Sequence, residues 1–289
     1  MINGQNTPKL IDTHLHLVYP EKFNYSWIKD VPALAQSDFT IENYQSLIKD
    51  SGVAKAIFME TATDDEYWQD ETRFVLELMN KPDNILAGIV ASCRPELDEK
   101  QFDRWLERTQ GDQVIGYRRI LHIFPDEMSQ TDLFKKNIKK IGSVGKTFDL
   151  CVLEKQLPIA INLAKSCANT KFILNHCGIP EISSGNMKFW KLHITELAKL
   201  PNVFCKISGV IAYCPTGNAN AEALRPYLEH CIDSFGWERL VWGSDWPVCN
   251  LAKGISHWLD VFQELIHQES NETQTNIAFN NAASIYNLK

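Results

Sequence analysis

The sequence predicts an α/β protein whose eight parallel strands close into a (β/α)8 TIM barrel. Short β-branched runs alternate eight times with longer amphipathic stretches along the 289 residues, which is typical of a parallel sheet with helices outside it. No glycine-rich phosphate fingerprint follows the first strand, and this favours a closed barrel over a dinucleotide-binding sheet. No linker or internal repeat divides the chain. Because barrels commonly reach this length as one unit, we expect a single domain over residues 1–289.

Each strand is expected where a short apolar run gives way to a loop. In chain order the expected strands are Lys9–Leu17, Ala54–Glu60, Ile85–Ser92, Val114–Leu121, Phe148–Val152, Lys171–Cys177, Val203–Gly209 and Arg239–Asp245. Helices are expected over the amphipathic stretches Thr40–Ser51, Asp65–Asn80, Asp98–Gln110, Thr131–Val144, Glu154–Ala168, Met187–Leu200, Asn220–Phe235 and Gly254–Gln268, with one more within 271–287. Asp38 or Thr40 can cap the first helix, and Gly52 follows its end, as helix start and stop signals require.

Composition and charge exclude several classes of function. Apolar residues make up 44% of the chain and charged residues 22%, as in an ordinary soluble globular protein. A net charge of −7 argues against a general affinity for nucleic acid or anionic membranes. No segment approaches the roughly 20 apolar residues of a membrane span, and residues 1–9 lack the apolar core of a secretory signal. We therefore expect a cytoplasmic protein; its oligomeric state is left open.

The cysteines show no metal-binding pattern in the sequence. None of the eight forms a Cys-x-x-Cys pair, and several lie in apolar runs such as 203–205. A free thiol in such a run behaves as a small hydrophobe. The sequence therefore predicts reduced, mostly buried thiols rather than a zinc–cysteine site.

Two short motifs near the two ends of the chain could carry chemistry. In the first strand, His14 and His16 share one face, because side chains alternate along a strand. In the run Gly-Ser-Asp-Trp-Pro, Asp245 ends the last strand. If the barrel closes, two imidazoles and a carboxylate converge, a set that can hold a catalytic divalent metal or a hydrolytic water. His176 ends the sixth strand and can reach the same point, although it could also serve only to orient a loop.

Further side chains are expected to shape a substrate pocket at the mouth of the barrel. The candidates are Trp27, Glu60, Arg118, His122, Lys206 and Trp246. Arg118 and His122 share inward parity if the fourth strand stays regular. Glu60 could bind a sugar hydroxyl, lie near a metal or have a structural role, and Lys206 is as often a salt-bridge partner as a ligand contact. The two tryptophans could form apolar walls or simply fill the barrel mouth.

Seven runs distributed over nearly the whole chain match a known family. They are Ile11-Asp-Thr-His-Leu-His16, Phe23-Asn-Tyr-Ser-Trp27, Gly116-Tyr-Arg118, Phe148-Asp-Leu150, Asn175-His-Cys-Gly178, Cys205-Lys-Ile-Ser-Gly209 and the long final run Phe235–Cys249. In these runs the sequence resembles the amidohydrolase superfamily, specifically its branch of sugar lactonases and 2-pyrone-4,6-dicarboxylate lactonases. The resemblance implies a distorted (β/α)8 barrel and a hydrolase that opens a small-molecule lactone.

The resemblance also implies roles for individual residues. Asp245 would act as general base on the water that attacks the lactone carbonyl, while Arg118, His176 and the other two histidines would stabilise the oxyanion. His14, His16 and Asp245 could hold one zinc ion, but the branch also contains metal-free members, so both modes stay open.

The fifth strand departs from the pattern of most metal-dependent members of the superfamily. It reads Phe-Asp-Leu-Cys-Val over 148–152 and contains no histidine, and the fourth strand offers Arg118 where binuclear members have a bridging residue. This departure disfavours a zinc-dependent decarboxylase, the first alternative to a lactonase. A non-catalytic barrel that only binds ligands is the second alternative, and the presence of all four central residues speaks against it. A neutral sugar-acid lactone and a dianionic lactone are both open as substrates.

Overall fold

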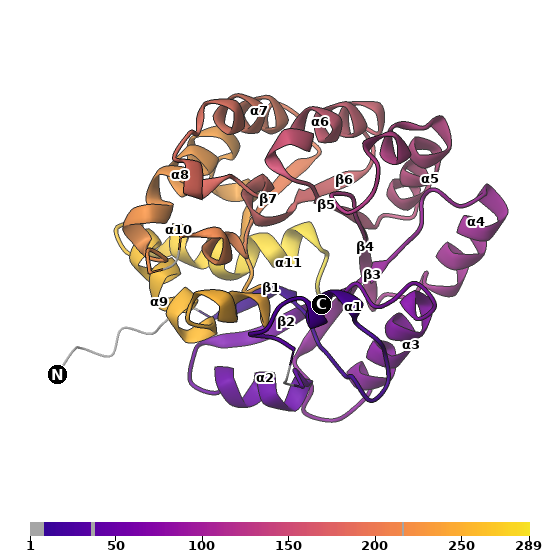
Figure 1. Cartoon of the computed structure of the whole chain (residues 1–289), viewed down its shortest axis with the longest axis horizontal. Coiled ribbons are helices and arrows are strands. Elements are labelled where there is room, and N and C mark those ends of the chain that lie inside the picture. Colours follow the sequence, from indigo (N-terminus) through magenta and orange to yellow (C-terminus); the bar gives the residue numbers. More distant parts are fainter. Residues whose placement is uncertain (1–8, 36–37, 216) are drawn as a thin grey trace.

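Eight parallel strands form one sheet in the computed structural model, which describes residues 9–35, 38–215 and 217–289. The strands are β1 (Leu10–Leu15), β2 (Val53–Met59), β3 (Leu86–Ser92), β4 (Val114–Ile120), β5 (Thr147–Cys151), β6 (Lys171–Leu174), β7 (Val203–Ile207) and β8 (Leu240–Trp242). They pair in chain order from β1 to β8. Figure 1 shows the helices arranged around the outside of these strands. The predicted (β/α)8 barrel is confirmed.

The outer helices occupy every stretch where a helix was expected. They are α2 (Ile41–Ile48), α3 (Trp68–Met79), α4 (Glu99–Arg108), α5 (Asp132–Ser143), α6 (Leu157–Ser166), α7 (Lys188–Ala198), α8 (Ala221–Phe235) and α9 (Ile255–Ile266). Thr40, one of the two expected caps, accepts the amide of Asn43 at 3.3 Å and so begins α2. The four-residue α1 (Ser26–Lys29) lies in the loop after β1 and is too short to leave a periodic signal in the sequence. Among the described residues, no helix is both long and apolar enough to cross a bilayer.

Backbone contacts between the two ends of the chain bring β1 and β8 together. The amide of Asp245 donates to the carbonyl oxygen of His14 at 2.8 Å, and the amide of His16 donates to that of Trp246 at 2.8 Å. Gly243 permits this close approach, because a Cβ atom there would lie 2.7 Å from the Cβ of His14. Closure of the barrel therefore joins the two motifs that the sequence analysis singled out.

β6 and β8 end earlier than predicted. β6 ends at Leu174 and β8 at Trp242, so His176 and Asp245 lie in the loops that follow rather than on the strands. Their φ angles are +55° and +57°, in the left-handed region that side chains other than glycine seldom adopt. Period-two alternation cannot predict such a conformation, and residues held in it concentrate at functional sites.

Apolar side chains fill the interior of the barrel on the side away from the carboxyl ends of the strands, and the last helical segment covers that side. Ile11, Ile57 and Ile173 belong to a buried hydrophobic cluster inside the barrel. The last helical segment runs through α10 (Asn271–Thr275), a π-helical turn (Asn276–Asn280) and α11 (Asn281–Ile285), and α11 contributes to the same cluster. His14, His176 and Asp245 lie instead at or after the carboxyl ends of their strands, the face where barrel enzymes place their active sites.

Candidate active site

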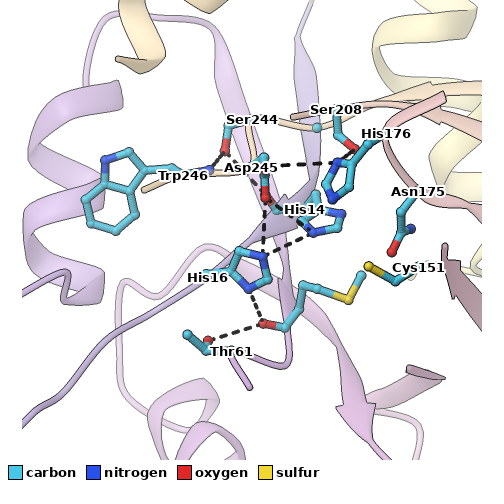
Figure 2. A network of polar contacts seen from close by, with 12 residues as sticks. His14, His16, Thr61, Cys151, Asn175, His176, Ser208, Ser244, Asp245 and Trp246 are labelled. Atoms are coloured by element: carbon cyan, nitrogen blue, oxygen red, sulfur yellow. Dashed lines mark hydrogen bonds and ion pairs between the residues drawn. The ribbon is translucent and has the colours of Figure 1, made fainter. Parts of the chain in front are cut away.

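His14, His16 and Asp245 converge on one buried point at the carboxyl end of the barrel. The Nε2 atoms of the two histidines are 3.2 Å apart. The Oδ1 atom of Asp245 lies 3.5 Å from Nε2 of His14 and 3.3 Å from Nε2 of His16. All three side chains are buried, and Figure 2 shows them turned toward one another.

This triangle of atoms has the dimensions of one face of a tetrahedral zinc site. Zinc binds nitrogen and oxygen ligands at about 2.0–2.2 Å, which places any two of them about 3.3–3.6 Å apart. The three measured edges are 3.2, 3.3 and 3.5 Å. Nδ1 of His16 donates to the carbonyl oxygen of Met59 at 3.0 Å, so the lone pair of its Nε2 faces the triangle. The three side chains fit a single divalent ion with one position open.

His176 reaches the same centre from the loop after β6. Its Nδ1 lies 2.9 Å from Oγ of Ser208 and 4.0 Å from Oδ2 of Asp245. Its ring centroid is 4.6 Å from that of His14. Burial lowers the pKa of His176 to about 4 and the pKa of His16 to about 3. Both imidazoles are therefore uncharged at neutral pH.

Arg118 and Glu60 form a buried ion pair beside His14. Nε of Arg118 donates to Oε1 of Glu60 at 2.7 Å, and Nη2 donates to the Glu60 carbonyl oxygen at 2.6 Å. The remaining nitrogen, Nη1, lies 3.3 Å from Nε2 of His14. Although burial opposes ionisation, the Arg118 guanidinium keeps the pKa of Glu60 below its usual value. These contacts fit the structural role considered for Glu60, in which it holds Arg118 in place, and its other considered roles stay predictions.

Lys206 lies beneath the centre, inside the barrel. Its ammonium donates to Oδ1 of Asp149 at 2.8 Å and to the carbonyl oxygen of Thr13 at 2.9 Å. The side chain is fully buried. Of the two roles expected for Lys206, the salt bridge is the one that the structure contains. The reason is register: the strand pairing places Lys206 opposite a carboxylate two strands away, which parity alone cannot reveal.

Within the described parts of the chain, Asp245 is the carboxylate of the centre that forms no ion pair with an arginine or lysine side chain. Arg118 is neutralised by Glu60, Lys206 is neutralised by Asp149, and the neighbouring imidazoles are uncharged. Burial raises the pKa of Asp245, while His176, Arg118 and Lys206 act in the opposite direction. A buried carboxylate facing two imidazole lone pairs favours the binding of a cation.

The two tryptophans of the sequence analysis occupy different places. Trp246 points away from Asp245, and its ring packs in the outer layer 5.2 Å from Phe39 and 5.5 Å from Tyr44 between centroids. Its ring therefore does not face the centre around Asp245, and this position does not fit the expected role as a pocket wall. Trp27 is half-buried on α1, where its Nε1 donates to the carbonyl oxygen of Thr61 at 2.9 Å and ties the loop to the end of β2.

His122 lies just beyond β4, whose last residue is Ile120. Its Nδ1 is 3.6 Å from Sγ of Cys151, at the end of β5. Burial lowers the pKa of His122, and the charge of Arg118 lowers it further. The side chain is thus a half-buried, neutral group at the rim of the centre.

Two further residues of the site, both after β7, were not predicted. The ring of Tyr213 lies 6.3 Å from that of His176, and 37% of the residue is exposed, so it borders the mouth of the site. A Cβ atom at Gly209 would lie 2.3 Å from Oδ2 of Asp245 and 2.4 Å from Nδ1 of His176. Gly209 ends the run Cys205–Gly209, one of the seven runs that resemble the amidohydrolase superfamily, and that resemblance could have identified it. Tyr213 lies in a loop without any motif.

Comparison with known proteins places the chain in a family. A sequence model of the amidohydrolase family matches residues 11–288. The chain belongs to the amidohydrolase family. One relative of this amidohydrolase is the L-fucono-1,5-lactonase of Burkholderia multivorans, which is 28% identical over 258 residues that span 84% of this chain and 83% of the relative. The L-fucono-1,5-lactonase of Burkholderia ambifaria is 26% identical over 248 residues, with 84% and 81% covered.

A solved structure shares the fold of this amidohydrolase over nearly its full length. It is the crystal structure of an amidohydrolase from Burkholderia multivorans with bound zinc. The two chains are 23% identical and superpose with a TM-score of 0.87, covering 97% of this chain and 100% of the other. The likeness extends to the complete barrel, which agrees with the fold derived from the sequence.

Proposed function

We propose that this amidohydrolase hydrolyses a lactone, with Asp245 as the general base for the attacking water. The observation that carries the proposal is the convergence of Asp245 with Nε2 of His14 and Nε2 of His16, at 3.5 and 3.3 Å. Membership of a hydrolase family and the names of the two lactonase relatives support the class of reaction.

The two oxygens of the Asp245 carboxylate face different partners, and this divides their roles. Oδ1 lies toward the Nε2 atoms of His14 and His16, whereas Oδ2 lies on the side of His176. In the proposed reaction, Oδ2 takes the proton of the water as its oxygen attacks the lactone carbonyl carbon. The raised pKa of Asp245 makes it a stronger base than an ordinary carboxylate, provided that it is ionised.

The carbonyl oxygen becomes negatively charged during the attack and needs donors aimed at it. Nη1 of Arg118 is the guanidinium nitrogen that does not bond to Glu60, and it faces the centre beside His14. It stabilises the oxyanion, and the ion pair with Glu60 fixes its position. When the tetrahedral intermediate collapses, the ring C–O bond breaks and Asp245 returns its proton to the leaving oxygen. The product is the open hydroxy acid.

A divalent ion bound by His14, His16 and Asp245 would act as a Lewis acid on the carbonyl or on the water. The three edges fit the bond lengths of zinc, and a related amidohydrolase structure contains zinc. We therefore propose one zinc ion as cofactor. The metal-free alternative uses the same residues to bind the water directly, and removal of the metal distinguishes the two.

We further propose that the substrate is a neutral sugar-acid lactone rather than a dianionic one. A dianion needs free cations to bind its carboxylates, but Arg118 is paired with Glu60 at 2.7 Å and Lys206 with Asp149 at 2.8 Å. The rim instead offers the phenol of Tyr213 and the neutral imidazole of His122, both of which can hydrogen-bond to hydroxyl groups. The names of the two relatives agree with this choice.

A lactone panel assayed with a pH indicator tests the proposal, because each ring opening releases a proton. The panel contains neutral aldonolactones and 2-pyrone-4,6-dicarboxylate, with enzyme as purified, after chelation and after addition of zinc. We expect opening of a neutral lactone, loss of activity on chelation and recovery with zinc. Full activity after chelation would support the metal-free mode. If no lactone is opened, the proposed function is wrong.

A further inference from the structure

Three buried thiols meet behind the loop that carries His176, in a cluster that the proposed mechanism does not use. Cys177 follows His176 directly, Cys205 lies on β7 and Cys231 lies on α8. Their sulfur atoms all lie within 4.8 Å of one another, and each residue is at most 2% exposed. The three cysteines are far apart in the sequence, so the fold, and not a spacing motif, brings them together.

We propose that Cys177, Cys205 and Cys231 form a binding site for one thiophilic divalent metal ion of the zinc class, distinct from the centre around Asp245. Zinc–sulfur bonds of about 2.3 Å place the sulfurs of a tetrahedral site about 3.8 Å apart. The observed separations are within 4.8 Å, so a small inward movement of the side chains completes the geometry. Thiolates select such soft ions over magnesium or calcium.

The charge of the cluster agrees with a divalent ion. The surroundings are apolar, and a buried site cannot accumulate charge without a large cost. The cluster has three thiols that can lose protons to an incoming ion, and their sulfur atoms already lie within 4.8 Å of one another. A divalent ion that displaces two thiol protons leaves the net charge of the cluster unchanged. A monovalent ion that displaced the same protons would add a buried negative charge.

The site would cross-link three elements that form the wall behind His176. The carbonyl oxygen of Cys177 accepts a hydrogen bond from Nε1 of Trp190, on α7, at 2.7 Å. Sγ of Cys177 lies 3.8 Å from the carbonyl oxygen of Lys206, which is an oxygen that could complete the coordination shell. We therefore expect a structural ion that stabilises this wall, whether or not the barrel hydrolyses lactones.

Cobalt(II) is the probe that separates the two proposed centres. Thiolate ligands give cobalt an intense near-ultraviolet charge-transfer band, whereas the imidazole and carboxylate ligands around Asp245 give only weak visible bands. The full chain is expressed in cobalt-supplemented medium, so that the ion is present while the buried cluster forms. We expect the thiolate band in the wild type and in Asp245→Asn, with a stoichiometry of a single thiolate-bound cobalt per chain.

Cysteine variants identify the ligands. Cys205→Ala and Cys231→Ala should each lose the band, while Cys167→Ala, which removes a buried thiol outside the cluster, should keep it. Circular dichroism establishes that each variant is folded. The thermal midpoint of Asp245→Asn, which lacks a ligand of the other centre, should rise with cobalt bound, and it should not rise when Cys205→Ala or Cys231→Ala is added to that variant. A wild type without the band, or a band that survives in both cluster variants, overturns the proposal.

Discussion

Glu60 shows how a single buried residue can control the chemistry of the centre. It contacts Arg118 through its carboxylate and its carbonyl oxygen, and both partners are at most 3% exposed. Replacing Glu60 with Gln leaves a buried guanidinium without a counter-charge, which costs about 3–5 kcal/mol of stability. The displaced guanidinium should also lower kcat/KM by about 10²-fold. Denaturant unfolding and steady-state kinetics measure the two effects.

A matched control for this variant lies on the outside of the barrel. Arg119 follows Arg118 and pairs with Glu96 at 2.5 Å, but Glu96 is partly exposed. Glu96→Gln should therefore keep the wild-type kcat/KM, because neither Glu96 nor Arg119 contacts Arg118 or the centre through its side chain. If Glu60→Gln behaved like Glu96→Gln, Glu60 would not position Arg118.

At the scale of elements, the turn after β7 leaves the space in which the side chains of His176 and Asp245 lie next to each other. Gly209 has a φ of +57°, and an added Cβ would lie 2.3 Å from Oδ2 of Asp245. Gly209→Ala should therefore displace the carboxylate and reduce kcat by about 10²-fold. Gly185→Ala is the control, because Gly185 also has a positive φ of +65° but has open space around its added Cβ. Equal activity of the two variants in the lactone assay would contradict this account.

The position of α3 predicts a pH dependence of stability. Glu71 on α3 is buried, and its Oε1 accepts the amide of Thr61, just after β2, at 3.0 Å. Burial, reinforced by the charge of Glu60, raises the pKa of Glu71 to about 8 from 4.5. The folded chain therefore keeps a proton that the unfolded chain releases. This contribution to stability is complete below pH 4.5 and is lost as the pH rises through about 8.

Denaturant unfolding at a series of pH values checks this expectation. Between pH 5 and pH 8, Glu71 should make the unfolding free energy fall by up to about 1.4 kcal/mol per pH unit. Glu71→Gln cannot titrate and should remove that slope. Glu77→Gln, at an exposed position of the same helix, should retain it. A wild type and a Glu71→Gln variant with the same slope would show that Glu71 is ionised in the folded protein.

At the scale of the whole molecule, the regular parts of the barrel could be predicted from the sequence. Strand runs and helical periodicity are local properties, so every strand and outer helix lies where it was expected. The ends of β6 and β8 were not predictable. The left-handed conformations of His176 and Asp245 depend on contacts between segments far apart in the chain, and hydrophobic patterns carry no information about them.

The residues of the candidate site likewise include some that the sequence predicts and some that it does not. The shared face of His14 and His16 follows from strand parity and needed no structure. The pairing of Lys206 with Asp149, the outward turn of Trp246 and the meeting of three cysteines depend on which residues become neighbours across strands and helices. Such neighbours are set by the register and twist of the closed barrel, which no single segment of sequence specifies.

The central claim is that barrel closure turns Asp245 into the base of a lactone hydrolase. Its most direct test is the initial rate at which zinc-loaded wild type and Asp245→Asn open a neutral sugar-acid lactone, with Asp233→Asn, an exposed position on α8, as control. We predict that Asp245→Asn is folded but slower by about 10²–10⁴-fold, the usual contribution of a general base, and that Asp233→Asn matches the wild type. Wild-type turnover by folded Asp245→Asn would contradict the account.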